Sequence, residues 1–189
     1  MIIANRLKTE NRAEYLLYMW QVEGIIRLYG CDAERIAREY LSRFDVPAEV
    51  AAEMAQWYAD LCEMMRSEGK MEQGHLQICE NVIIGLADLN AQLLASDKYP
   101  YYKQMYYKVL PYVVELCAKR RGSGVEREEA DGADEFRQLF ELLYGVMLLR
   151  LQQKEVSPDT LRATADITAL LGQLSDYWKA DRAGELKFD

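Results

Sequence analysis

Apolar residues recur along most of the chain at alternating steps of three and four, the spacing that places side chains on one face of an α-helix. No strand-like alternation of apolar and polar residues persists, and glycine and proline punctuate the periodic segments. The pattern therefore predicts an all-α protein. Its predicted helices cover about residues 11–29, 33–44, 48–69, 71–95, 98–121, 134–153 and 158–179.

Short links between most of these helices predict antiparallel packing in a bundle of about six to seven helices, formed by a single domain over residues 1–189. Asp32 and Ser157 are predicted N-caps, the latter followed by a proline in the first turn. Pro111 should kink or divide the fifth helix, because proline lacks a backbone donor and crowds the preceding turn. Residues 122–133 are glycine-rich and acidic and predict a mobile loop, and residues 182–189 a frayed tail.

Interior glycines recur in four predicted helices, where each costs roughly 0.5 to 1 kcal/mol relative to alanine. Close helix packing is the favoured explanation, and space for a ligand between helices is the alternative. These glycines are Gly24, Gly85, Gly145 and Gly172.

Composition narrows the possible functions. The net charge of −8 and the pI of about 4.9 repel a nucleic-acid backbone, and the basic run Lys119-Arg120-Arg121 is better explained as a match to a helix C-terminus. The N-terminal residues do not resemble a signal peptide, and no apolar run approaches the roughly 20 residues of a membrane span. We therefore expect a soluble, cytoplasmic protein that binds neither nucleic acid nor membrane. The four cysteines are widely spaced, as expected for reduced, buried thiols.

His75 is the only histidine, and it lies three residues after Glu72 and four before Cys79. On a helix over 71–95, His75 and Cys79 belong to the apolar stripe, and Glu72 continues it one turn earlier. Glu-x-x-His is the ligand spacing of dinuclear carboxylate proteins, but that site needs a second histidine. A symmetric dinuclear centre is therefore excluded unless two chains each supply half of it. A single metal held by His75 with Glu14, Glu23 or Glu115 stays open.

Two further interpretations of His75 do not involve a metal. A cysteine-histidine dyad with Cys79 lacks a recognisable third group and oxyanion hole. A core histidine satisfied by Glu72, a backbone carbonyl or a water is favoured, and no cofactor is predicted.

Glu23 lies in the most apolar predicted helix. If it is buried it needs a partner, and Arg27 one turn later is the nearest candidate. Exposure on a narrow polar strip is equally compatible with the pattern.

Tyrosine is concentrated between residues 99 and 112. Tyr102 and Tyr106 fall on the core stripe of their helix, whereas Tyr101, Tyr107 and Tyr112 do not. Tyrosine suits protein interfaces because a large apolar ring carries a polar tip, so a helix–helix or dimer contact is favoured over a ligand platform.

Three blocks carry a resemblance to known proteins: AEYLLYMWQVEGIIRLY (13–29), EGKMEQGHLQICENVI (68–83) and YYKVLPYVVEL (106–116). They resemble the recurring blocks of a bacterial family of uncharacterised all-helical proteins, a domain of unknown function, over most of the chain up to about Leu149. The resemblance implies a helical fold and supplies no activity, cofactor or catalytic residue.

Together these patterns favour a non-enzymatic helical-bundle protein that acts through contacts with itself or with a protein partner. The alternative is a pocket in the bundle for a small ligand or a single metal. The candidate residues for that pocket are His75, Glu72, Cys79, Glu23, Tyr102 and Tyr106.

Overall fold

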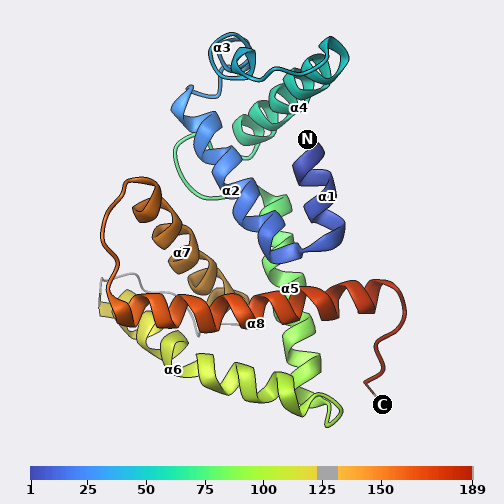
Figure 1. Cartoon of the computed structure of the whole chain (residues 1–189), viewed down its shortest axis with the longest axis vertical. Helices are drawn as coiled ribbons and strands as arrows, with labels where there is room; N and C mark the ends of the chain where they lie inside the picture. Colours follow the sequence, from blue (N-terminus) through green and yellow to red (C-terminus); the bar gives the residue numbers. More distant parts are fainter. Residues whose placement is uncertain (123–131, 189) are drawn as a thin grey trace. The chain divides into compact units, whose positions relative to one another are not determined.

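The computed structural model describes residues 1–122 and 132–188, with the side chains of 119–122 left out (Figure 1). Over these residues all regular structure is helical, which confirms the all-α class. The helices are α1 (Ile2–Glu10), α2 (Arg12–Leu28), α3 (Ala33–Glu39), the 3-10 helix η1 (Leu41–Arg43), α4 (Ala48–Ser67), α5 (Gln77–Ala95), α6 (Pro100–Gly122), α7 (Gly132–Leu151) and α8 (Pro158–Arg182).

Residue contacts group the chain into two compact units. The first comprises Met1–Thr9 and Glu14–Asn81, and the second Glu10–Ala13 and Val82–Asp189. The divisions fall before the last residue of α1, within α2 and within α5, so each of these helices contributes residues to both units. The single-domain antiparallel bundle stays a prediction.

The first unit has an apolar core that most of its helices line. Asp32 caps α3 as predicted, since its side chain accepts a hydrogen bond from the backbone N–H of Arg35. α3 packs against α4. The fully buried side chains of this core include Leu16, Met19, Trp20, Ile26, Ile36, Cys62 and Met65.

In the first unit one helix was not predicted and two predicted boundaries were wrong. α1 was not predicted, because its segment is only nine residues long. The helix predicted over 33–44 ends at Glu39 and continues as η1. The helix predicted over 71–95 begins only at Gln77, because residues 71–76 form an irregular segment in which Gly74 has a φ of +79°.

In the second unit α8 lies along α6 and also contacts α7, as Figure 1 shows. Ser157 caps α8 through the backbone N–H of Thr160, and Pro158 occupies its first turn, both as predicted. The core of the unit includes Tyr102, Val109, Val113, Phe136, Phe140, Ile167, Leu170 and Leu174.

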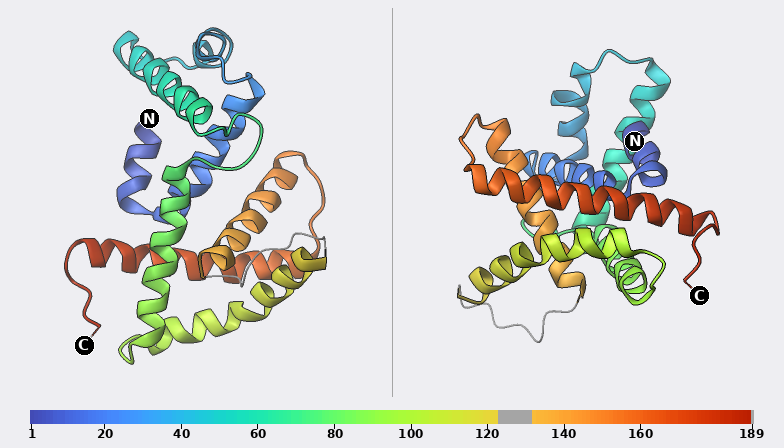
Figure 2. Two further views of the ribbon diagram at one scale, coloured as in Figure 1. Left: turned by 180° about the vertical axis from the view of Figure 1, so that it is seen from behind. Right: turned by 60° about the horizontal axis from the view of Figure 1, so that its bottom comes forward.

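α6 continues through Pro111 without a break in its helical assignment, so the proline does not divide it. Figure 2 shows the axis of α6 curving along its length, as expected where a proline interrupts the helical hydrogen bonds on the solvent side. Of the predicted acidic loop, residues 123–131 lie outside the described residues, and Gly132 and Ala133 already belong to α7.

Three of the interior glycines do not mark close helix packing among the described residues. A Cβ atom added at Gly85, Gly145 or Gly172 would meet no described atom within 4 Å.

Among the described helices, α5 is long and apolar enough to meet the criteria of a membrane span, with a mean hydropathy of 1.3. The buried core helix of a protein that does not cross a membrane meets the same criteria.

Candidate functional site

The side chain of Glu23 is a fully buried carboxylate on α2, with 0% of its surface exposed. Oε2 lies 2.7 Å from Nδ1 of His75 and 3.9 Å from Nη1 of Arg27. Oε1 accepts a hydrogen bond from the backbone N–H of Leu76 at 3.0 Å and another from Sγ of Cys79 at 3.4 Å. A buried charge is tolerated only with such partners, so Glu23 is the centre of a polar cluster inside an apolar unit.

The imidazole of His75 is held on two sides. Its ring stacks on the indole of Trp20, with the ring centroids 3.9 Å apart and the planes 11° from parallel. Because a carboxylate accepts hydrogen bonds, the neutral imidazole carries its proton on Nδ1 and leaves a lone pair on Nε2. No described residue hydrogen-bonds Nε2, and 21% of the side chain is exposed.

Two glutamates determine where α5 begins. The carbonyl of Leu76 accepts the first helical hydrogen bonds, from Cys79 and Glu80, while its own N–H is bound by Glu23. The N–H of Gln77 donates to Oε2 of Glu68 at 2.7 Å. Negative groups at a helix N-terminus stabilise it, because they satisfy free donors and oppose the positive end of the helix dipole.

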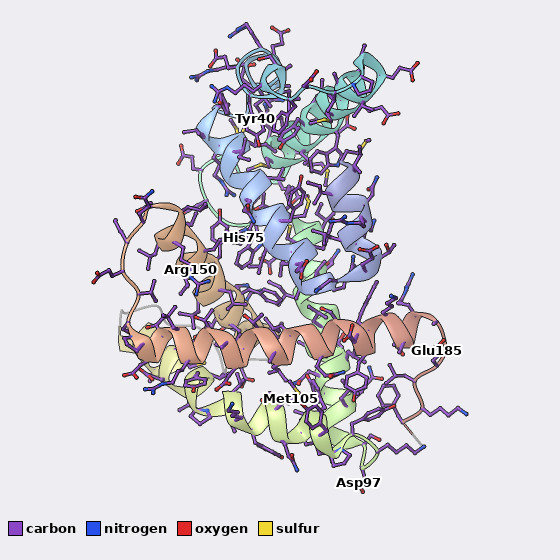
Figure 3. The ribbon with its side chains drawn as sticks, viewed as in Figure 1. Tyr40, His75, Asp97, Met105, Arg150 and Glu185 are labelled. Atoms are coloured by element: carbon purple, nitrogen blue, oxygen red, sulfur yellow. The ribbon has the colours of Figure 1, made fainter. Side chains whose placement is uncertain are left out.

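The segment before His75 is fixed against α2. Nε and Nη2 of Arg27 each donate to the carbonyl of Lys70 at 3.2 Å, and Nη2 also bonds the carbonyl of Gly74. Figure 3 shows His75 beside α2, in agreement with these contacts. The same helix therefore positions the histidine and supplies its carboxylate partner.

The structure brings together three of the residues proposed from the sequence: Glu23, His75 and Cys79. The predicted contact between Glu72 and His75 is wrong for the described residues. Glu72 is exposed, and because 71–76 are not helical, the i, i+3 arrangement does not exist. The carboxylate that His75 meets is Glu23, 52 positions away.

Tyr102 and Tyr106 belong to the second unit, and their described contacts are there. The hydroxyl of Tyr102 donates to Asn90 at 2.6 Å, and burial raises its pKa. The hydroxyl of Tyr106 donates to Oε2 of Glu135 at 3.3 Å; burial, and secondarily the charge of Glu135, raise the pKa of Tyr106 to about 12.

The chemistry of Cys79 argues against a cysteine nucleophile. Burial, and secondarily the charge of Glu23, raise the pKa of its thiol, so it stays protonated and donates to the carboxylate. Its described partner is Glu23 and not His75. Among the described residues no group of three or more histidine, cysteine, aspartate or glutamate side chains is placed to hold a metal ion.

Sequence reasoning missed Trp20 as part of this site. A signal was present, since Trp20 precedes Glu23 by three residues and side chains at that spacing share one helix face. The role of Leu76 could not be predicted from such a spacing, because its backbone N–H reaches Glu23 only after α2 and the start of α5 have packed together.

A small open cavity also lies in the second unit, with a volume of about 150 Å³. That volume is below the range of about 300–1,000 Å³ typical of small-molecule sites. Its lining residues are Tyr112, Glu115, Leu116, Leu142, Asp159, Thr160 and Ala163.

Fold and site together describe an all-helical protein with a buried glutamate–histidine pair. The chain belongs to the family described as Domain of unknown function (DUF4924), whose model matches residues 1–185. This match extends beyond Leu149 and includes α8. No curated protein and no solved structure shows significant similarity to the chain.

Proposed function

We propose that the protein acts through contact between two copies of itself, made by the outer face of α6. This face consists of six positions at steps of four, three, four, three and four: Pro100, Gln104, Tyr107, Pro111, Val114 and Ala118. All six are exposed, with Tyr107 at 63% and Val114 at 61%. This largely apolar outer face on the solvent side of a helix carries the proposal.

The outer face is distinct from the buried side of the same helix. The core positions Tyr102, Val109 and Val113 lie on the opposite side of α6, all buried. α6 therefore carries two apolar stripes, although one is enough to pack a helix onto its own unit. The steps of three and four are the heptad spacing by which helices of separate chains pair.

A second copy is the occupant that the charges favour. With a net charge of −8, two copies repel each other, so a contact between them needs a region without carboxylates. None of the six positions is acidic. Two antiparallel copies of α6 crossing near Pro111 bring Tyr107 of one toward Val114 of the other, the self-complementary geometry of a two-fold dimer.

The test is the molar mass in solution, measured by size exclusion with light scattering. The wild-type chain is expected to be a dimer, and Tyr107→Glu combined with Val114→Glu a folded monomer by circular dichroism. Tyr101→Glu is the matched control, since Tyr101 is also 63% exposed on α6 but lies off the outer face. A monomeric wild-type chain, or a double variant that still dimerises, overturns the proposal.

A second candidate function is small-ligand binding at His75. The observation that favours it is the half-buried imidazole, stacked on Trp20, whose Nε2 has no hydrogen-bond partner among the described residues. Native mass spectrometry of the untagged protein checks it, since a retained ligand gives a mass excess that His75→Ala should abolish. An unchanged excess in the variant assigns the ligand to another site.

A further inference from the structure

The Glu23–His75 pair presents one reactive atom of the only histidine in the chain. Nδ1 is bound to the carboxylate at 2.7 Å, and the ring is held flat against Trp20. Nε2 then carries the lone pair of the neutral ring, and part of the side chain is open to solvent. Such an atom can act as a base or as a nucleophile, and the surrounding groups indicate which electrophile suits it.

An acyl group is the less suitable electrophile. Acyl transfer needs preorganised N–H donors for the oxyanion. The backbone N–H groups nearest in sequence to His75 on the α5 side, those of Leu76 and Gln77, are already bound by Glu23 and Glu68. They are therefore not available as an oxyanion hole.

A phosphoryl group fits the site better. Its transfer requires mainly a positioned nucleophile and positive charge near the phosphoryl oxygens. Two cationic side chains contact Gly74, the residue before His75. The side chain of Lys70 folds over Gly74, with its Nζ 3.3 Å from the position that a Cβ of residue 74 would occupy. Arg27 donates a hydrogen bond to the Gly74 carbonyl. Both belong to the same unit as His75.

We propose that Nε2 of His75 is a phosphoryl acceptor, modified by a small phosphoramidate or acyl phosphate. The lone pair of Nε2 forms the new N–P bond, while the bond from phosphorus to the leaving group breaks and the leaving group takes its electron pair. The Nδ1 proton stays on the ring, which gains positive charge, and the adjacent Glu23 carboxylate balances that charge. The inference uses the His75 site of the second candidate function and is independent of the α6 contact.

Glu23 is a positioning residue in this scheme, and Trp20 holds the plane of the ring. The carboxylate selects the Nδ1–H form of the ring and stabilises the charge that develops on it, as a buried carboxylate does for a histidine general base. The indole face favours a cationic ring by the same electrostatics that attract other cations to aromatic faces.

The test is incubation of the whole protein with potassium phosphoramidate, with phosphorylated histidine followed by phosphorus NMR and intact mass. The folded chain should gain one phosphoryl group, at Nε2, roughly tenfold or more faster than the urea-unfolded chain. His75→Gln should gain none. Equal rates in the folded and unfolded chains, or attachment to Nδ1, overturn the proposal.

Two variants separate the chemistry from stability. Glu23→Gln removes the charge, and its rate should fall toward that of the unfolded chain; Glu72→Gln changes a nearby exposed glutamate and should react like wild type. If Glu23→Gln does not fold, the comparison of folded and unfolded wild type still decides the question. A tightly bound ligand in native mass spectrometry without phosphoramidate reactivity would support the second candidate function and overturn the phosphoryl acceptor.

Discussion

Oε2 of Glu23 lies 2.7 Å from Nδ1 of His75, although the two residues are 52 positions apart, Glu23 on α2 and His75 in the irregular segment before α5. The other carboxylate oxygen binds the N–H of Leu76 at the start of α5. One side chain of α2 therefore orients the only histidine and also binds a backbone N–H at the start of α5.

Replacing Glu23 by leucine should lower the free energy of unfolding by about 3 kcal/mol, because the change leaves buried donors on His75 and Leu76 without an acceptor. Urea unfolding followed by circular dichroism measures the effect. Glu72→Leu is the control: its side chain is exposed, so a change within about 0.5 kcal/mol is expected. Equal losses in the two variants would show that the carboxylate of Glu23 is not structurally special.

Gly172→Ala should raise the free energy of unfolding by about 0.5 to 1 kcal/mol. The residue lies inside α8, a Cβ there meets no described atom within 4 Å, and alanine favours the helix. Gly74→Ala is the contrast, because Gly74 has a φ of +79° and its Cβ would approach the side chain of Lys70 at 3.3 Å. Thermal unfolding of the two variants should show opposite shifts of Tm. A lower Tm for Gly172→Ala would point to a contact with a further molecule.

Stability should fall as pH rises from about 10 toward about 12, in part through Tyr106. Burial, and secondarily Glu135, raise its pKa from 10.0 to about 12, so over this range the unfolded chain releases a proton that the folded chain keeps. The unfolded state binds fewer protons there, and the free energy of unfolding decreases. Tyr106→Phe should lessen the decrease in urea midpoints measured across this range. Tyr101→Phe, at a 63% exposed site, should not, and equal effects would contradict the assignment to Tyr106.

Cys117 should be the first of the four cysteines to react with a thiol reagent under native conditions. Cys31, Cys62 and Cys79 are buried, and burial raises the pKa of each of these thiols, that of Cys62 to about 11. Cys117 is only partly buried. Ellman's reagent should label about one thiol rapidly, and Cys117→Ser should abolish that phase. A rapid phase that persists in the variant would show local opening around another cysteine.

The helical class and most helix positions follow from the sequence alone. The predicted caps at Asp32 and Ser157 are present, and the helix after Pro47 begins and ends close to its predicted bounds. These features are local, since a cap and an apolar period involve residues within a few turns of each other. α1 was not predicted because its segment of nine residues is too short for a periodic pattern to stand out.

The site depended on contacts that no local pattern encodes. The sequence assigned His75 to a helix with Glu72 as its neighbour, whereas Arg27 and Glu23 hold the segment before α5 out of the helical conformation. The sequence is compatible with Glu23 being buried beside Arg27 or exposed on a polar strip. It is buried, and Nδ1 of His75 lies closer to its carboxylate than Nη1 of Arg27 does, at 2.7 Å against 3.9 Å.

The sequence by itself therefore determined an all-α chain with one histidine and an acidic glutamate-rich character, because composition and short-range periodicity are properties of neighbouring residues. Tertiary structure alone decided that Glu23, Trp20 and His75 meet. That meeting requires α2 and the segment before α5 to pack together, and a buried carboxylate takes whichever donors the packing places within hydrogen-bond distance.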